Sequence, residues 1–539
     1  MTEQIEDIKH SLDLILKSWT HSDKLIPLYQ DLLNHKSYLE AFFISETYLQ
    51  GNQKTGTTSI NHIEKLLSKI LEYQSQNLKA KRLKYKLKVA IARLRYVVDN
   101  IKYSFELSAD DYASLDENHP RFQAVKNVTK VVEIGSKDEI LRQLKIFHKR
   151  YDAVKAVIYN FLKYKQSRSR NLMTGIMLVY FAFCRSEAKR YARLYESSLN
   201  YESAETLWNM PNTTLVKKLT LSKLQSITVN QMIFIPKTSP FVLENASTDV
   251  TLEGDSGFYM KPDNDKGLVA VRILSRSSIP ALPITKGEKF QNQIKKIVIH
   301  AHGGGYISMS SFSHQTYTRI WANNLDAVIF SLDYRLSPKH PFPSALDDIW
   351  QCYNWIIKFS SEHLGISPSE IVLVGDSAGG NLITSLTLKL LESGSQLPDG
   401  LLMIYPSLGK NSEYFSMSSF IALHDKILPF PLFPVMHKCF LANGNYGRDY
   451  LVSPVLAPVE LLSNFPFSIM MVTESDPLCF NAFRFADKLL RANASVSINL
   501  FPHVPHGALN FGNKDAVPIF SNFIDNAQDN LKILLKLDN

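Results

Sequence analysis

The sequence predicts an α/β fold, with a mostly parallel sheet covered by helices, preceded by a large all-helical N-terminal domain. Three observations support this prediction. From about residue 231 onward, short apolar segments alternate with helical segments, as in parallel sheets whose two faces are both covered. Before about residue 200, apolar residues recur every three or four positions and glycine is rare, which indicates helices. The chain has 539 residues, more than a single core usually holds, so two domains are expected.

The domain boundary is predicted near residue 230. The cluster from Trp208 to Asn212 contains helix breakers, and the first strand-like segment begins at Gln231. Residues 1–230 are therefore expected to form a helical regulatory or cap domain, and residues 231–539 the domain that carries the chemistry.

The expected strands and helices of the second domain alternate along the chain. In a parallel sheet, functional side chains lie at the carboxyl ends of the strands, so these ends are the places to search for a site. The predicted strands are 231–235, 267–274, 296–301, 327–332, 370–374, 400–405, 468–473 and 496–501. The predicted helices are 313–323, 345–361, 382–392 and 481–492.

Composition and charge are those of a soluble folded protein, with 45% hydrophobic and 21% charged residues. The net charge of +9 favours attraction to anionic surfaces, but no nucleic-acid-binding motif accompanies it, so nucleic acid is not an expected partner. The four cysteines lie far apart in apolar surroundings, without metal-type spacing, and are expected to be reduced thiols.

The N-terminal region indicates a cytoplasmic protein. Met1 to Asp7 is acidic and lacks the basic and apolar regions of a signal peptide. The most apolar helical segment, Leu172 to Cys184, has 13 residues, too few to span a bilayer. A second helical segment, Lys79 to Arg95, is basic and amphipathic. Such a helix either contacts a lipid surface or packs its apolar face inside the domain, and packing is the more common case.

The stretch from Ile371 to Gly380, IVLVGDSAGG, is typical of a strand, a tight turn and the start of a helix. A G-x-S-x-G turn of this kind strains the serine backbone and lifts the hydroxyl out of the sheet, above the start of the helix. The alternative is a Gly/Ser turn without chemistry, which the pentapeptide alone does not exclude. The strand before it and the helix after it favour Ser377 as a nucleophile.

A second strand end carries a glycine-rich turn, from His302 to Gly305. Glycines directly after a strand leave backbone N–H groups approachable, and such donors hold the negative oxygen that forms when a carbonyl is attacked. Gly303 and Gly304 are the predicted donors, together with the N–H of Ala378, and His302 is expected to brace the loop. A phosphate-binding turn is the alternative, but no P-loop Lys-Ser/Thr follows it.

A nucleophilic serine needs a base, and the base needs an acid to orient it. After the last predicted strand come His503 and His506, and His506, which precedes a glycine, is the better candidate. The strand before it ends at Asp476, the predicted acid, whereas Glu474 is still within the strand and is the poorer candidate. Asp476 alone is also explained as a helix N-cap. The order Ser377, Asp476, His506 on three strand ends predicts a catalytic triad.

These motifs resemble those of the hormone-sensitive lipase branch of the α/β-hydrolases. The turn from His302 to Gly305 and the stretch from Gly375 to Asn381 match its HGGG and GDSAGGN motifs, and DYRLSPKHPFP, from Asp333 to Pro343, is similar to a further signature. The resemblance covers about residues 296–512, and the long helical N-terminal region is similar too. Two features differ: Ala508 replaces a usual aromatic residue, and the chain lacks the long phosphorylated insert of animal members between the nucleophile and acid motifs.

The resemblance implies an α/β-hydrolase fold and a neutral ester hydrolase that needs no metal or cofactor. It implies lipid esters as substrates, namely diacylglycerol, other acylglycerols, and sterol esters such as cholesteryl esters. It further implies association with lipid droplets or a membrane surface, and a homodimer. A short-chain carboxylesterase and an inactive hydrolase-like binding protein remain as alternatives.

Overall fold

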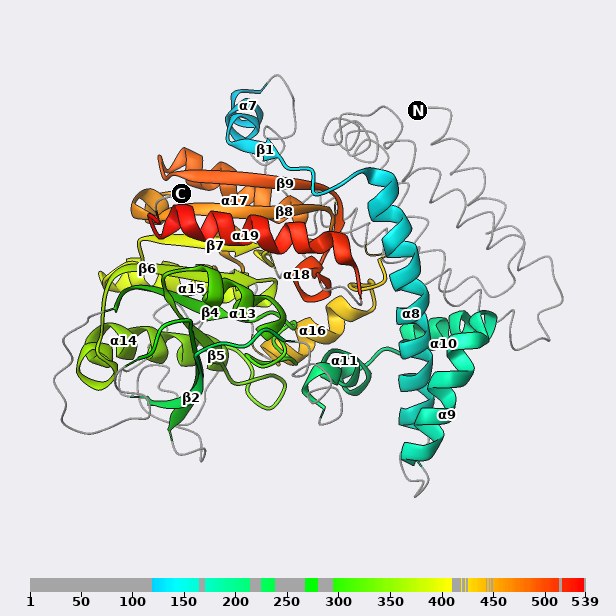
Figure 1. Ribbon diagram of the computed structural model, residues 1–539. Coiled ribbons are helices and arrows are strands. Elements are labelled where there is room, and N and C mark those ends of the chain that lie inside the picture. Colours follow the sequence, from blue (N-terminus) through cyan, green and yellow to red (C-terminus); the bar gives the residue numbers. More distant parts are fainter. Residues whose placement is uncertain are drawn as a thin grey trace. The chain divides into compact units, whose positions relative to one another are not determined.

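The computed structural model describes residues 119–163, 170–213, 224–237, 267–279, 294–409, 418, 422, 425–442, 444, 446, 449–512 and 516–537. Two compact units divide the chain: residues 1–127 with 411–425, and residues 128–410 with 426–539. Helix α7 (Pro120–Asn127) belongs to the first unit, and all other elements named below belong to the second (Figure 1). The predicted basic helix, Lys79 to Arg95, lies outside the described residues.

The described strands form one nine-stranded sheet with the order β1-β9-β8-β7-β6-β4-β5-β3-β2. Neighbours from β1 to β5 in this order run parallel, while β3 and β2 complete one edge in antiparallel pairs. This mostly parallel sheet confirms the predicted fold class, and every predicted strand lies in it. The strands are β1 (Thr129–Val131), β2 (Val229–Pro236), β3 (Leu268–Ser275), β4 (Ile294–Ala301), β5 (Val328–Asp333), β6 (Ile366–Asp376), β7 (Gly400–Ile404), β8 (Phe467–Ser475) and β9 (Val496–Pro505).

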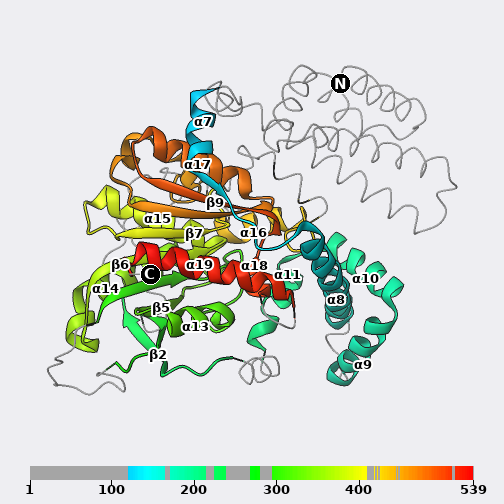
Figure 2. The same cartoon turned by 45° about the horizontal axis from the view of Figure 1, so that its top comes forward.

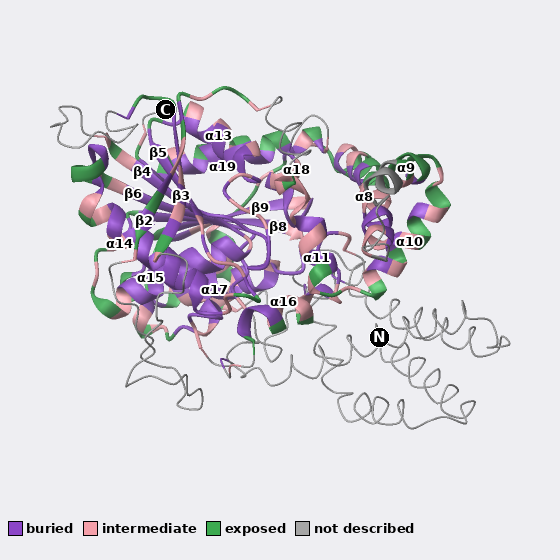
Figure 3. Cartoon of the chain, turned by 90° about the horizontal axis from the view of Figure 1, so that it is seen from below, coloured by how far each residue is buried: buried purple, intermediate pink, exposed green. Residues whose placement is uncertain are grey.

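The central strands are apolar because both faces of the sheet are covered. Every residue of β7 is buried, as are all but the last of β5. Figure 3 shows α13 and α19 over one face of the sheet, and α14, α15 and α17 over the other. The helices are α8 (Lys137–Lys163), α9 (Arg170–Phe183), α10 (Arg185–Ser197), α11 (Tyr201–Trp208), α13 (Gln315–Asn324), α14 (Ser344–Leu364), α15 (Ala378–Ser393), α16 (Leu432–Leu441), α17 (Cys479–Arg491), α18 (Ala508–Phe511) and α19 (Ser521–Leu534).

Helices α13 and α19 supply the large side chains of the core on their face of the sheet. Tyr317 and Trp321 of α13 and Phe523 of α19 belong to one buried cluster with inward residues of the parallel strands, such as Val372. Burying each aromatic side chain contributes about 1.5–3 kcal/mol. The indole N–H of Trp321 donates to the carbonyl of Ile524, 3.3 Å away, so its polar group is satisfied. This packing fixes α13, which borders the site described below.

Strand β1 lies in the region for which the sequence predicts helices only. It pairs in parallel with β9, and three residues are too few to show a strand periodicity in the sequence. Helix α8 follows, and Ile140, Leu144 and Phe147 in its first half join the same core as the sheet. Residues 128–410 and 426–539 therefore belong to the compact unit that contains the sheet. The boundary near residue 230 stays a prediction.

Four helices, α8, α10, α11 and α16, contribute to a second apolar cluster at the carboxyl end of the sheet (Figure 2). The cluster contains Trp208 of α11 and Leu432 of α16. It also contains Ile307 and Leu478, which follow β4 and β8. These helices therefore lie beside the strand ends at which the sequence places the site.

Candidate active site

Ser377 occupies the turn between β6 and α15, as the sequence predicts. Its backbone has φ 56° and ψ −115°, a region that non-glycine residues rarely adopt, so the turn is strained. The neighbouring glycines permit the close approach of the elements around the turn. A Cβ atom at Gly379 would lie 1.9 Å from the carbonyl oxygen of Ala301 at the end of β4. Glycine at this position therefore lets the serine turn pack directly against β4. This strand leads into residues 302–305, the predicted oxyanion loop.

The structure brings the three predicted triad residues together. The Nε2 atom of His506 lies 2.8 Å from Ser377 Oγ, and its Nδ1 atom lies 2.7 Å from Asp476 Oδ2. Strands β8 and β9 are neighbours, so their carboxyl ends hold the aspartate and the histidine side by side. The poorer candidates, Glu474 and His503, contact each other instead, with 3.3 Å between His503 Nδ1 and Glu474 Oε2.

Asp476 and His506 are oriented by their own neighbours. The Thr473 hydroxyl and the Leu478 N–H donate to the two carboxylate oxygens of Asp476, at 3.0 and 2.8 Å. The ring of Tyr405 packs against that of His506, with 4.7 Å between the ring centroids, and burial raises the pKa of Tyr405 well above its usual value. Tyr405 is not among the residues predicted from the sequence, where its one signal is its position at the end of a predicted strand. The uncharged ring of Tyr405 therefore packs against His506 and holds its orientation.

The oxyanion loop follows β4 and lies against the serine turn. The Gly303 N–H donates to Asp376 Oδ1 at 3.0 Å, so this predicted donor already has an acceptor in the structure. Among the described residues, the N–H groups of Gly304 and Ala378 donate no hydrogen bond. Gly304 has φ 109°, a conformation that favours glycine. The assignment of Gly304 and Ala378 as oxyanion donors stays a prediction, and Gly303 would have to release Asp376 before it acts as one.

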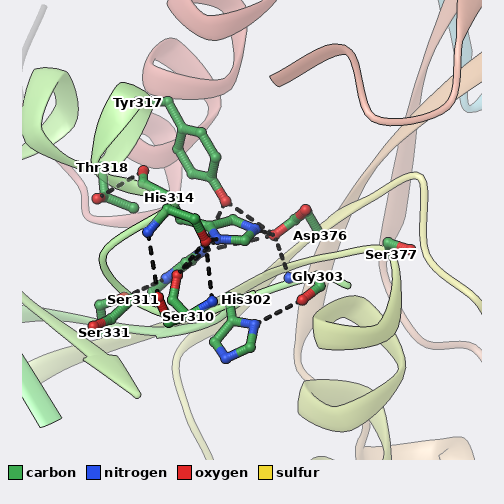
Figure 4. A network of polar contacts seen from close by, with 12 residues as sticks. His302, Gly303, Ser310, Ser311, His314, Tyr317, Thr318, Ser331, Asp376 and Ser377 are labelled. Carbon is green, nitrogen blue, oxygen red and sulfur yellow. Dashed lines mark hydrogen bonds and ion pairs between the residues drawn. The ribbon is translucent and has the colours of Figure 1, made fainter. Parts of the chain in front are cut away.

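Asp376, directly before the nucleophile, is the centre of a buried polar network (Figure 4). Besides the Gly303 N–H, its carboxylate accepts a hydrogen bond of 2.9 Å from the Tyr317 hydroxyl. His314 Nε2 and His300 Nε2 lie 3.6 and 3.8 Å from the same oxygen. Burial disfavours the ionised carboxylate. Electrostatic attraction and hydrogen bonding from His314 and His300 outweigh burial, so the pKa of Asp376 lies well below its usual value. The network therefore holds a buried carboxylate at the junction of β6, the oxyanion loop and α13.

His300 and His302, on either side of Ala301, are both buried. Burial lowers the pKa of both, that of His302 to about 3. His302 Nδ1 donates to the Gly303 carbonyl at 2.7 Å, and its ring stacks on Tyr334, with 4.2 Å between the centroids. The Tyr334 hydroxyl in turn donates to the His302 carbonyl at 2.6 Å. His302 thus braces the oxyanion loop, as expected from the sequence.

Two apolar side chains from the helices at the carboxyl end of the sheet contact the oxyanion loop. A Cβ atom at Gly305 would lie 2.5 Å from Met436 Sδ of α16 and 2.9 Å from Trp208 Cζ3 of α11. In the sequence, Trp208 is recognisable only as part of a breaker cluster, so this contact was not predicted. Helices α11 and α16 therefore form an apolar wall beside the predicted oxyanion donors.

Within the described ranges, no group of His, Cys, Asp or Glu side chains has the arrangement of a metal site. The four cysteines, all of them described, form no disulfide, and Cys352 and Cys439 are buried.

Comparison with known proteins places the site in a known family. Residues 298–510 match the model of a family described as having the alpha/beta hydrolase fold. Mouse hormone-sensitive lipase is 36% identical over 181 residues, which are 33% of this chain and 23% of the mouse enzyme. The carboxylesterase NlhH of Mycobacterium tuberculosis is 30% identical over 217 residues, 40% of this chain and 67% of that enzyme. The chain thus aligns with less than a quarter of the length of the mouse lipase, but with two thirds of the bacterial carboxylesterase.

Proposed function

The chain belongs to the α/β-hydrolase family, in its hormone-sensitive-lipase-like branch, and we propose that it hydrolyses carboxylic esters of lipids. The observation that carries this proposal is the contact of His506 with both Ser377 Oγ and Asp476 Oδ2, at 2.8 and 2.7 Å. The curated relatives named above, a lipase and a carboxylesterase, support the same class of reaction.

The proposed mechanism begins with attack by Ser377 Oγ on the ester carbonyl carbon. His506 Nε2 accepts the serine proton, and Asp476 stabilises the imidazolium that forms. The carbonyl π electrons move to the oxygen, which becomes an oxyanion. When the oxyanion collapses, the bond to the alcohol breaks and His506 returns the proton to the leaving alcohol oxygen. Water, deprotonated by the same histidine, then releases the acid from the acyl-enzyme.

Backbone N–H groups stabilise the oxyanion in this mechanism. Ala378 begins α15, so its N–H points out of a helix N-terminus, where the helix dipole favours negative charge. Gly304 supplies a second donor from the other side of the substrate. Gly303 contributes through its hydrogen bond to Asp376, which fixes the loop, and serves as a third donor only if that bond opens.

Diacylglycerol, other acylglycerols and sterol esters are the proposed substrates, on the basis of the relationship to hormone-sensitive lipase. The apolar wall of Trp208 and Met436 beside the oxyanion loop suits an acyl chain better than a polar group. The relationship to a bacterial carboxylesterase supports the rival, an enzyme for short-chain esters. A profile of acyl-chain length separates the two, because a preference for emulsified long-chain esters favours the lipase and a preference for soluble short-chain esters favours the rival.

The reaction is tested with purified Ser377→Ala and His506→Ala variants. Each is expected to lose ester hydrolysis by several orders of magnitude while keeping the wild-type circular dichroism spectrum. His503→Ala is the matched control, because this histidine pairs with Glu474 and is expected to leave the rate within about twofold. Wild-type activity in Ser377→Ala would refute the mechanism. Failure of a fluorophosphonate probe to label Ser377 in the wild type would instead favour an inactive binding protein.

A further inference from the structure

Helix α9 presents an apolar face to solvent. Ile176, Val179, Tyr180 and Phe183 are spaced so that they share one side of the helix. Their exposed fractions are 54%, 61%, 47% and 83%. Figure 3 shows the exposed colour along this helix. A contiguous group of large exposed apolar side chains marks an interaction surface.

The opposite side of α9 is anchored, so its exposed face is a defined surface. Phe181 is buried in a cluster with Ala156 and Val157 of α8 and Ala188 of α10, and Met177 packs against this cluster. Two side chains one helical turn apart therefore hold α9 on its supporting helices. The exposed residues lie on a different side of the helix.

Exposed basic residues follow this face directly in the chain. The sequence of α9 contains no acidic residue, and Arg185 and Lys189 at the start of α10 are exposed. The acidic residues of α10 are paired, Glu187 with Arg190 at 2.8 Å and Glu196 with the buried Lys155 at 2.9 Å. An apolar helix face bordered by arginine and lysine is complementary to an anionic lipid surface. A second copy of the chain would bring two basic borders together, which charge repulsion opposes.

The length of α9 determines how it meets a lipid layer. Its 14 residues span about 21 Å at 1.5 Å per residue, less than the roughly 30 Å of a bilayer core. Among the described residues, no helix is both long and apolar enough to cross a membrane. The helix can therefore lie in the plane of the interface, with its apolar face among the acyl chains.

We propose that α9 is a lipid-binding surface, which inserts Ile176, Val179, Tyr180 and Phe183 into the surface of an anionic phospholipid layer. Arg185 and Lys189 contact the headgroups. Binding at this surface does not depend on ester hydrolysis, so it stands or fails separately from the proposed reaction.

The supports of α9 also reach the candidate active site. Ile158 of α8 and Tyr195 of α10 belong to the apolar cluster that contains Trp208 and Ile307 beside the oxyanion loop. The ion pair between the buried Lys155 and Glu196 links α8 to α10. Lipid bound at α9 is therefore held by helices that pack in the same apolar cluster as Trp208 of the wall. If the proposed function also holds, an ester leaving the lipid layer is released close to that wall.

The experiment compares co-flotation of full-length protein with phosphatidylcholine vesicles that contain or lack phosphatidylserine. The wild type is expected to float with the anionic vesicles. The V179D/F183D variant is expected to partition at least about tenfold more weakly, because two side chains that enter the acyl region become charged. Ile533→Asp is the matched control, since Ile533 on α19 is 59% exposed and lies outside the proposed surface. It is expected to bind like the wild type.

A second variant tests the basic border and guards against a folding defect in the first. R185E/K189E keeps the apolar face. Its binding is expected to fall for vesicles that contain phosphatidylserine but not for pure phosphatidylcholine vesicles, and its remaining binding should depend less on salt than that of the wild type. Equal flotation of V179D/F183D and Ile533→Asp would overturn the proposal, as would a wild type that does not float. A wild-type dimer that V179D/F183D converts to monomers would assign the face to a second copy. Hydrolysis of a water-soluble ester by V179D/F183D at the wild-type rate would show that the site is intact, independent of lipid binding.

Discussion

Two aspartate–histidine assemblies lie next to Ser377, one in contact with its hydroxyl and one around the residue before it. In the first, Asp476 contacts His506 at 2.7 Å, and the other ring nitrogen of His506 faces the serine hydroxyl. In the second, Asp376 lies 3.6 and 3.8 Å from its two histidines and receives direct hydrogen bonds from a backbone N–H and a tyrosine. The residue types are similar, but the contacts differ.

The difference lies in what the histidine faces. His506 has one ring nitrogen on the acid and one on the nucleophile, so a proton can move through it. The ring nitrogens of His300 contact Ser331 Oγ and Tyr317 Oη, at 2.8 and 3.0 Å, and the side chain is completely buried. A proton on that ring has no path to a substrate. The first assembly is therefore suited to catalysis and the second to positioning.

Replacing the acid of the first assembly should have the largest effect. Asp476→Asn is expected to lower kcat by about 10⁴-fold, because an amide no longer selects the tautomer of His506 that accepts the serine proton. Single-turnover kinetics with a chromogenic ester measures the change. Glu474→Gln, two residues away, is the control and should alter kcat by less than about threefold. A kcat near wild type for Asp476→Asn would assign the acid to another residue.

Replacing the acid of the second assembly should have a smaller effect on rate and a large one on stability. Asp376→Asn is expected to lower kcat about 10²-fold with little change in KM, because the oxyanion loop loses its fixed distance to Ser377. The free energy of unfolding should fall by about 3–5 kcal/mol, since a buried charge network is broken. Asp529→Asn, on an exposed aspartate of α19, is the control for both measurements.

The contribution of Asp376 to the free energy of unfolding should depend on pH. The folded-state pKa of Asp376 lies below the ordinary value of 3.8, so its ionised form stabilises the folded state. This contribution is fully present above the unfolded-state pKa and is lost as the pH falls through the lower folded-state pKa. The difference in unfolding free energy between wild type and Asp376→Asn should therefore persist from pH 7 to about 4 and shrink at lower pH. A difference that grows on acidification would contradict the assignment.

The smallest expected effect comes from a single hydroxyl of the second assembly. Tyr317→Phe removes the donor that lies 2.9 Å from Asp376 Oδ1 and keeps the ring that packs in the core. The free energy of unfolding should fall by about 1–3 kcal/mol, and kcat by less than for Asp376→Asn, because the Gly303 hydrogen bond remains. Urea unfolding and steady-state kinetics on the same preparation measure both quantities. A rate loss equal to that of Asp376→Asn would show that Gly303 is not the main link to the oxyanion loop.

The sequence predicted three residues that the structure brings together, because the predicted reaction requires particular residue types in a fixed order. Ser377, Asp476 and His506 each follow an apolar strand, and parallel strands bring their carboxyl ends to one edge. The second assembly was missed because its members come from different segments of the chain. Packing in the core brings them together, and a single sequence does not show this packing. His314 precedes and Tyr317 lies on α13, for which the sequence predicted a helix, residues 313–323, but no polar role. Likewise, Trp208 reaches the oxyanion loop only through the packing of α11 on α16.

The pairing of β1 with β9 has a consequence for how the chain can be shortened. Without β1, the strand that carries His506 at its end would be the edge of the sheet, with its backbone N–H and C=O groups open to pairing with other chains. Removing the first part of α8 as well would uncover the core contacts of Ile140, Leu144 and Phe147. A fragment trimmed to the region that matches the family, residues 298–510, would therefore expose both an unprotected edge and an apolar face, and would aggregate even though it contains the whole triad.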